Sequence, residues 1–331
     1  MLEQYLPDIF LILMGLAVLI YAILDGYDLG VGIMLPMNNK TQRDQMIASI
    51  GPFWDANETW LVLAIGILLI AFPQAYSLVL HELYIPVSIM LSALILRGVA
   101  FDFRAKAVTH HQLLWDRLFK LGSLIAALTQ GYALGMYVMG FKSDWQAYTF
   151  ALLSAAGVAA AYAYIGGAWL VLKTEGSVQK YAAKWARRAG WLAAIGIAGI
   201  CIINPLISPA VAERWLSMPA ALLLLPVPVM CVLIVAVVDR YLRLVPHQND
   251  FGCWIPFGAV TSLFVLCILG LAYSYFPYVV PNQLTAEQAA SAPEALRFIF
   301  YGVIFVLPVI VAYTLFSYWI FRGKSTELRY W

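Results

Sequence analysis

Long apolar stretches recur along the whole chain, and they constrain its fold more than any other feature of the sequence. A helix needs about 20 residues to cross a hydrocarbon core about 30 Å thick. The stretches are continuous and lack the alternation of apolar and polar residues seen in transmembrane β-strands. We therefore predict an all-α polytopic membrane protein, with residues 1–331 forming one integral membrane domain. The nine predicted transmembrane helices lie at about 8–36, 53–73, 80–102, 118–140, 146–172, 189–208, 218–239, 254–276 and 296–321.

The connections between these stretches are too short to form separate domains. The longest are predicted at about 103–117, 173–188 and 277–295. Composition agrees with a membrane location, since hydrophobic residues make up 63% of the chain and charged residues 11%. A formal net charge of +2 leaves no basic surface for nucleic-acid phosphates. The four cysteines lie in apolar stretches without a CxxC pair, so they predict neither a disulfide framework nor a thiolate metal site.

Lysine and arginine residues predict the orientation, because they are retained on the cytoplasmic side during insertion. No basic residue precedes the first apolar stretch, so we expect that stretch to remain as a span rather than to be cleaved as a signal peptide. With the N-terminus outside and the C-terminus inside, 16 of the 20 basic residues fall on the inner side. Lys142, Arg214 and Arg297 then lie outside, and Arg97 lies within the third span.

Two acidic residues interrupt the first apolar stretch. A charged side chain at the bilayer centre costs at least about 2.5–3.5 kcal/mol unless it meets a partner or water. Asp25 and Asp28 are three residues apart and therefore share one helical face. Gly26, Gly30 and Gly32 lie beside them and would let another helix approach closely.

The next two spans bring further acids to a similar depth. Asp55 and Glu58 are again three residues apart at the start of the second span, and Asp102 follows Arg97 at the inner end of the third. Their spacing does not support an Arg97–Asp102 pair within one helix, so we expect Arg97 to pair across helices. A simpler interpretation is that Asp55 complements the helix dipole and Glu58 reaches the interface.

Two interpretations of the whole constellation stay open. Carboxyl groups in a low dielectric can take up protons and hand them on, which suits a proton pathway. Alternatively, the acids and Arg97 form a structural polar knot that holds three helices in register.

The histidines predict no haem or metal site in this chain. Haem iron needs an axial His, Met or Cys directed into a pocket, and only His81 touches a span, at its outer edge, where we interpret it as an interfacial anchor. His110 and His111 are adjacent in an inner loop and cannot form an i, i+4 ligand pair. His247 stands alone in another inner loop. We expect no catalytic residue, no metal and no cofactor ligated by the chain.

Three segments around the acids resemble the signature segments of subunit II of the cytochrome bd-type quinol oxidases, including the cyanide-insensitive ones. They read DGYDLGVG from Asp25, GPFWDANETWLV from Gly51 and RGVAFDFR from Arg97. Weaker similarities follow at GGAWLVLKTEG from Gly166 and IFRGK from Ile320. The resemblance is strong over the first third of the chain, and from about 180 to 315 it rests on the pattern of spans alone.

The resemblance implies two four-helix bundles plus one extra helix, paired with a haem-bearing subunit I in the bacterial inner membrane. Such enzymes oxidise membrane quinol and reduce O₂ to water with protons from the cytoplasm, and their subunit I carries haems b and d and the quinol site. The N-terminus would then be periplasmic and the C-terminus cytoplasmic. The subtype, the quinone used, a small single-helix accessory subunit and a structural quinone or lipid in this chain stay open.

The resemblance also implies a proton path past Asp25, Asp55 and Asp102. Glu58 and Asp28 match the same segments, and Arg97 is the expected polar partner. Two other functions stay open: an ion-coupled secondary transporter with a carboxylate site in the inner leaflet, and an assembly subunit whose acids move no protons. A transporter would show solute flux alone, whereas an oxidase subunit would do nothing detectable without its partner.

Overall fold

Long helices make up most of the structure, a computed structural model that describes residues 2–106, 111–218, 220–224, 226–247 and 250–325. Within these residues, eight helices are long and apolar enough to cross a membrane. The predicted all-α polytopic fold is therefore confirmed. The long helices are α1 (Leu2–Met34), α3 (Trp54–Ala71), α4 (Pro73–Lys106), α5 (Gln112–Val138), α6 (Trp145–Lys173), α7 (Gly176–Ile207), α10 (Pro226–Arg243), α11 (Ile255–Tyr275) and α13 (Pro293–Ile320).

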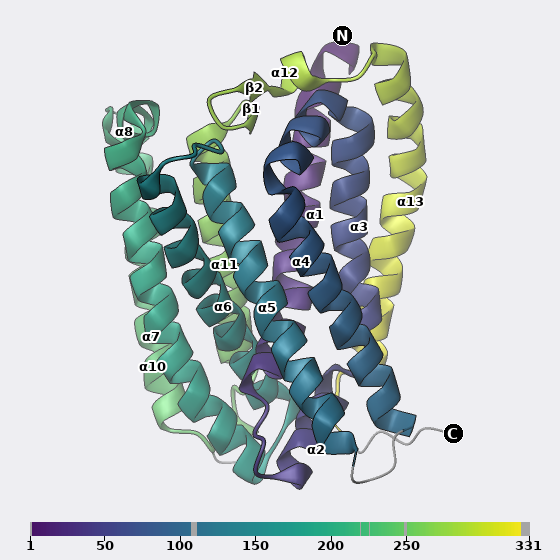
Figure 1. Cartoon of the computed structure of the whole chain (residues 1–331). Coiled ribbons are helices and arrows are strands. Elements are labelled where there is room, and N and C mark those ends of the chain that lie inside the picture. Colours follow the sequence, from purple (N-terminus) through teal and green to yellow (C-terminus); the bar gives the residue numbers. More distant parts are fainter. Residues whose placement is uncertain (1, 107–110, 219, 225, 248–249, 326–331) are drawn as a thin grey trace.

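The predicted number of nine spans is not confirmed. The stretch predicted at 218–239 forms the short α9 (Ala220–Leu224) and then α10, whose 18 residues include the charged Asp239, Arg240 and Arg243. Because of these three charges, α10 is not among the eight helices that are apolar enough to cross a membrane. Even so, α10 packs against α7 and α11, and it leads the chain back to the end of the bundle where α11 begins (Figure 1).

The prediction of a connection at 173–188 is wrong from Gly176 onward, where α7 begins. This segment is rich in basic residues, so an apolar-stretch criterion misses it although the helix is continuous. The predicted connection at 103–117 is helical at both ends, up to Lys106 and from Gln112, and 107–110 lie outside the described residues.

Short elements mark the two ends of the bundle (Figure 1). At one end lie α8 (Pro209–Leu216), the antiparallel strands β1 (Tyr278–Val280) and β2 (Leu284–Thr285), and α12 (Ala286–Ala289). We call it the α8 end. At the opposite end lies α2 (Lys40–Ile50), and we call it the α2 end. Helix α1 begins at the α8 end, and α13 finishes at the α2 end (Figure 1).

The helices form two groups of four. Contacts join α1, α3, α4 and α5 into one group and α6, α7, α10 and α11 into the other, while α13 lies outside both, against α1 and α3. With α10 counted, these groups match the predicted two bundles plus one extra helix, although α6 packs on α5 and α1 more extensively than on α11. The groups meet where α6 packs along α1 and α5.

A pair of glycines allows the closest approach between the groups. A Cβ atom on Gly30 of α1 would lie 1.8 Å from the Tyr162 carbonyl oxygen of α6, and one on Gly166 would lie 2.6 Å from the Gly30 carbonyl carbon. Only glycine at both positions lets the two backbones touch. This contact draws α6 against the glycine face of α1, which lies on the far side of the helix from Asp28.

Candidate functional site

A buried charged cluster joins α1, α3 and α4. The Nη1 atom of Arg97 donates to Oδ1 of Asp25 at 2.6 Å and to Oε1 of Glu58 at 3.0 Å, and its Nη2 atom lies 3.9 Å from Oδ2 of Asp28. The side chains of Asp25, Asp28 and Arg97 are fully buried, and that of Glu58 is 28% exposed. We call these four residues the Arg97 cluster. The predicted pairing of Arg97 across helices is confirmed.

Close packing holds the guanidinium of Arg97 in place. The rings of Trp54 and Phe119 lie against it, with centroids 6.0 and 5.9 Å from Cζ. Gly122 of α5 faces the same turn, where an added Cβ would lie 3.3 Å from the Cβ of Arg97 and 2.8 Å from the Ala93 carbonyl oxygen. Helix α5 therefore closes over Arg97 and excludes solvent from that side.

The Arg97 cluster contains three carboxyl groups and one guanidinium. Oδ2 of Asp25, Oδ1 of Asp28, and Nε and Nη2 of Arg97 make no hydrogen bond within the described part of the chain. Burying unpaired negative charge in a medium of low dielectric is costly. Binding a proton removes part of the excess charge, so the geometry suits a group of residues that takes up and releases protons.

Asn57 connects this cluster to two tyrosines. Its Nδ2 atom donates to Oδ2 of Asp28 at 2.8 Å and to the Tyr27 hydroxyl at 3.0 Å, and its Oδ1 atom accepts from the Tyr318 hydroxyl at 3.2 Å. The two tyrosine hydroxyls are 2.6 Å apart. Sequence reasoning missed Asn57 although it lies between Asp55 and Glu58. The sequence signal that could have revealed it is a polar amide side chain in the first turn of an otherwise apolar helix.

Two predicted residues lie apart from the cluster. Asp55, in the first turn of α3, and Asp102, near the end of α4, are exposed at the α2 end and form no hydrogen bond or ion pair with described residues. Asp55 is still close enough to Glu58 for their charges to interact. The structure thus brings together Asp25, Asp28, Glu58 and Arg97, and it leaves Asp55 and Asp102 at the surface.

A second charged group lies nearer the α2 end. The fully buried Asp116 accepts from Nε of Arg43 at 2.8 Å and from Nε of Arg104 at 2.5 Å, and Arg104 also pairs with Asp44. These residues tie α2, α4 and α5 together with opposite charges matched. Sequence reasoning assigned this region to a loop and therefore did not find Asp116.

Comparison with known proteins identifies the family. Residues 6–321 match the family model of cytochrome bd terminal oxidase subunit II. The chain belongs to this family. It is 27% identical to cytochrome bd-I ubiquinol oxidase subunit 2 of Escherichia coli (strain K12), with 98% of this chain and 96% of the relative covered. It is 28% identical to cytochrome bd ubiquinol oxidase subunit 2 of Bacillus subtilis (strain 168), with 97% of each covered.

A solved structure shows the same fold. The bd oxidase from Geobacillus thermodenitrificans superposes with a TM-score of 0.72 over 95% of this chain and 98% of that chain, at 18% sequence identity. The prediction of a bd-type subunit II is confirmed, and the transporter alternative is not favoured. This subunit II is part of a quinol:O₂ oxidoreductase, a multi-span bacterial respiratory complex that includes a subunit I and haem.

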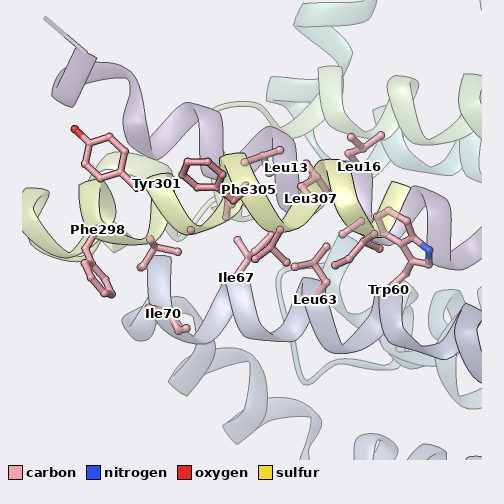
Figure 2. Close-up of a pocket in the computed structure, with 16 residues that line it drawn as sticks. Leu13, Leu16, Trp60, Leu63, Ile67, Ile70, Phe298, Tyr301, Phe305 and Leu307 are labelled. Carbon is pink, nitrogen blue, oxygen red and sulfur yellow. The ribbon is translucent and has the colours of Figure 1, made fainter. Parts of the chain in front are cut away.

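This subunit II has an apolar groove whose lining determines whether it could ligate a haem. The groove has a volume of about 620 Å³ and lies between α1, α3 and α13 (Figure 2). Its sixteen lining residues include no histidine, methionine or cysteine, so it supplies no such axial ligand. His81 is exposed on α4, and the His247 ring packs on Tyr241 with centroids 4.2 Å apart. No group of three or more potential metal ligands occurs within the described residues. The groove thus offers no histidine, methionine or cysteine to a haem iron.

Proposed function

We propose that this subunit II conducts protons from the α2 end through the Arg97 cluster toward the haem-bearing subunit I. Reduction of O₂ to water consumes protons, so an oxidase needs a supply route through its apolar interior. The observation that carries the proposal is the convergence of Asp25 and Glu58 on a single nitrogen of Arg97 inside apolar helices.

The exposure of the acids supports a direction for this route. Asp55 is exposed, Glu58 is 28% exposed, and Asp25 is fully buried. Asp55 would collect protons at the surface, with Asp102 as a second acceptor at the same end. Glu58 would then pass a proton inward to Asp25.

Arg97 would control the transfer between the carboxyl groups of Asp25 and Glu58. Because its Nη1 atom contacts both Asp25 and Glu58, the guanidinium still neutralises one carboxylate when the other is protonated. The proton can then move between them while Arg97 stays paired with whichever of the two carboxylates remains charged. Asp28, held by Asn57, supplies a third site beside this pair.

The remaining assignments follow from this proposal. The α2 end faces the cytoplasm, which leaves the N-terminus periplasmic and the C-terminus cytoplasmic. Haems b and d and the quinol site belong to subunit I, and this chain holds no redox centre. A single-helix accessory subunit would add to the complex, and the groove of Figure 2 would take the apolar tail of a structural quinone or lipid.

Substitution of Asp25 tests the route. Asp25→Asn keeps the size and much of the hydrogen bonding of the side chain but does not titrate. We expect turnover and proton uptake of the assembled complex to fall about tenfold or more, which corresponds to about 1.4 kcal/mol or more on the limiting step. Asp25→Glu should retain more activity, and Asp55→Asn should also slow proton uptake.

Asp116→Asn is the matched control, because Asp116 is equally buried but lies in the neighbouring group of matched charges. It should change stability and leave the turnover of each assembled complex unchanged. Assembly and haem content are measured first by spectroscopy. Wild-type turnover in an assembled Asp25→Asn complex would mean that the acids only hold the helices together.

Orientation has its own test. A periplasm-active reporter fused after Trp331 should be silent, and one fused near Lys142 should be active. The opposite pattern would reverse the proposed direction of proton uptake.

A further inference from the structure

A hydrogen-bonded chain of three neutral side chains lies beside Asp25. The Tyr162 hydroxyl donates to Oε1 of Gln130 at 2.8 Å, and Nε2 of Gln130 donates to the Tyr21 hydroxyl at 2.7 Å. Tyr21 lies on α1, Gln130 on α5 and Tyr162 on α6. The proposed proton route does not use these residues.

The chain is positioned next to the Arg97 cluster, on the side that faces the α8 end. Tyr21 precedes Asp25 by one helical turn on the same face of α1. The ring of Tyr162 lies against Gly26, where an added Cβ would be 2.7 Å from the ring. Gly26 therefore admits Tyr162 beside Asp25.

The direction of the hydrogen bonds leaves the Tyr21 proton unused. Tyr21 accepts from Gln130, so its own O–H can point along α1 toward Asp25. Gln130 has both ends of its amide occupied, one as donor and one as acceptor. An amide passes a proton onward only if its oxygen gains one while its nitrogen loses one, and this forms a high-energy imidic acid.

We propose that Tyr21, Gln130 and Tyr162 form a neutral cap that ends the proton route at Asp25 and bars protons from the α8 end. The proposal rests on the proposed function, since it concerns the limit of that route. Gln130 is a positioning residue. Its amide orients the Tyr21 hydroxyl toward Asp25, and it separates the titratable hydroxyls of Tyr21 and Tyr162 with a group that does not titrate. We call this trio the Gln130 cap.

The surroundings of the Gln130 cap agree with this role. Asp25 is its charged neighbour, with Arg97 directly behind, and toward the α8 end the core consists mainly of apolar side chains from α1, α3, α4, α5 and α6. All buried charged side chains in the described residues lie on the α2 side of the cap. A proton that passed Gln130 would meet no charged group in that core.

Replacing the amide with a carboxyl group tests the cap. A carboxyl group can accept a proton on one oxygen and release one from the other, so Gln130→Glu would extend the route, whereas Gln130→Leu has a similar size and cannot titrate. Purified complexes are reconstituted into vesicles, and passive proton leak is measured without quinol after a pH jump. Turnover is then measured against pH.

We expect Gln130→Glu to raise the leak several-fold and Gln130→Leu to leave it near the wild-type value. Tyr21→Phe should displace the pH profile of turnover, because the carboxyl of Asp25 loses its hydroxyl neighbour. Tyr137→Phe is the matched control: Tyr137 is on α5 like Gln130, but its hydroxyl donates to the Val279 carbonyl at the α8 end. It should change neither leak nor profile.

Unchanged leak in Gln130→Glu together with an unchanged pH profile in Tyr21→Phe would overturn the cap. The leak is measured without turnover, so this result is separate from that of Asp25→Asn. If Asp25→Asn slows turnover while the Gln130→Glu leak and the Tyr21→Phe pH profile both stay unchanged, the route stands and the cap is wrong. If Gln130→Glu does not assemble, the Tyr21→Phe profile decides, since that variant loses only a hydroxyl group.

Discussion

The halves of the bundle nearest the α2 end and the α8 end are built differently. All buried charged side chains in the described residues lie toward the α2 end: Asp25, Asp28, Arg43, Arg97, Asp116, Lys173 and Asp239. Toward the α8 end the buried core is mainly apolar, with members such as Phe10, Ile67, Phe72 and Phe150.

The extra helix α13 shows the same contrast. At the α2 end, Tyr318 bonds to Tyr27 and Asn57, and Lys173 of α6 donates to the carbonyl groups of Phe321 and Gly323. Along its middle, α13 faces α1 and α3 across the apolar groove (Figure 2), and Leu307 and Ile310 pack against the buried apolar residues beside it. The polar half therefore fixes positions through directional bonds, and the apolar half provides non-directional packing and a barrier to charge.

Removing Arg97 should have the largest effect on stability. Arg97→Gln breaks a fully buried ion pair and leaves its carboxyl partners without a counter-charge, which costs about 3–5 kcal/mol. The measurement is the thermal stability of the detergent-solubilised complex. Arg297→Gln is the control at the α8 end, because the Arg297–Glu3 pair is about half exposed and should contribute at most about 1 kcal/mol. Equal losses in the two variants would contradict the contrast between the halves.

A charge placed in the apolar half should be the next most harmful change. Met14 packs against the apolar core, 12 residues into α1 and therefore about 18 Å along it. Met14→Glu should cost about 3 kcal/mol when the side chain is charged. Met14→Gln has the same size without the charge and should cost less. If the melting temperatures of the two variants agree at neutral pH, the apolar half tolerates charge and is no barrier.

Loss of one hydroxyl group at the α2 end of α13 should have a smaller effect. Tyr318→Phe removes the bonds to Tyr27 and Asn57, which should lower stability by about 1 kcal/mol. Tyr313→Phe, on the same helix, removes the hydroxyl of an exposed side chain and should be neutral. A melting-temperature shift for Tyr313→Phe as large as that for Tyr318→Phe would count against polar attachment of this helix.

The smallest effect should come from Asp250, in the loop before α11. Burial raises the pKa of Asp250, but the Gln179 amide and the Lys324 ammonium lower it more, so the pKa lies below its ordinary value. Its contribution is therefore complete above the unfolded pKa of about 3.9 and is lost as pH falls through the lower folded value. Asp250→Asn should cost at most about 1 kcal/mol near neutral pH.

Melting temperatures of wild type and Asp250→Asn should converge as the pH falls below about 4. If the melting temperatures of wild type and Asp250→Asn instead diverge as the pH falls, the pKa of Asp250 is not lowered in the folded protein.

The sequence by itself determined the membrane class, the position of most helices and the residue types of the site. Continuous apolar stretches leave no alternative to helices in lipid, and acids three residues apart must share a helical face. The same spacing excluded an Arg97–Asp102 pair within α4 and so predicted a partner on another helix.

Only the tertiary structure decided which side chains meet. Periodicity sets the face of a helix on which a residue lies but not the helix that packs against that face. Asp25 and Glu58 therefore share Arg97 while Asp55 and Asp102, equally acidic in sequence, remain at the surface. The bond between Tyr27 and Tyr318 spans 291 positions. Such contacts depend on how closely two helices approach each other, as at Gly30 and Gly166, and a local sequence pattern does not determine which helices pack together.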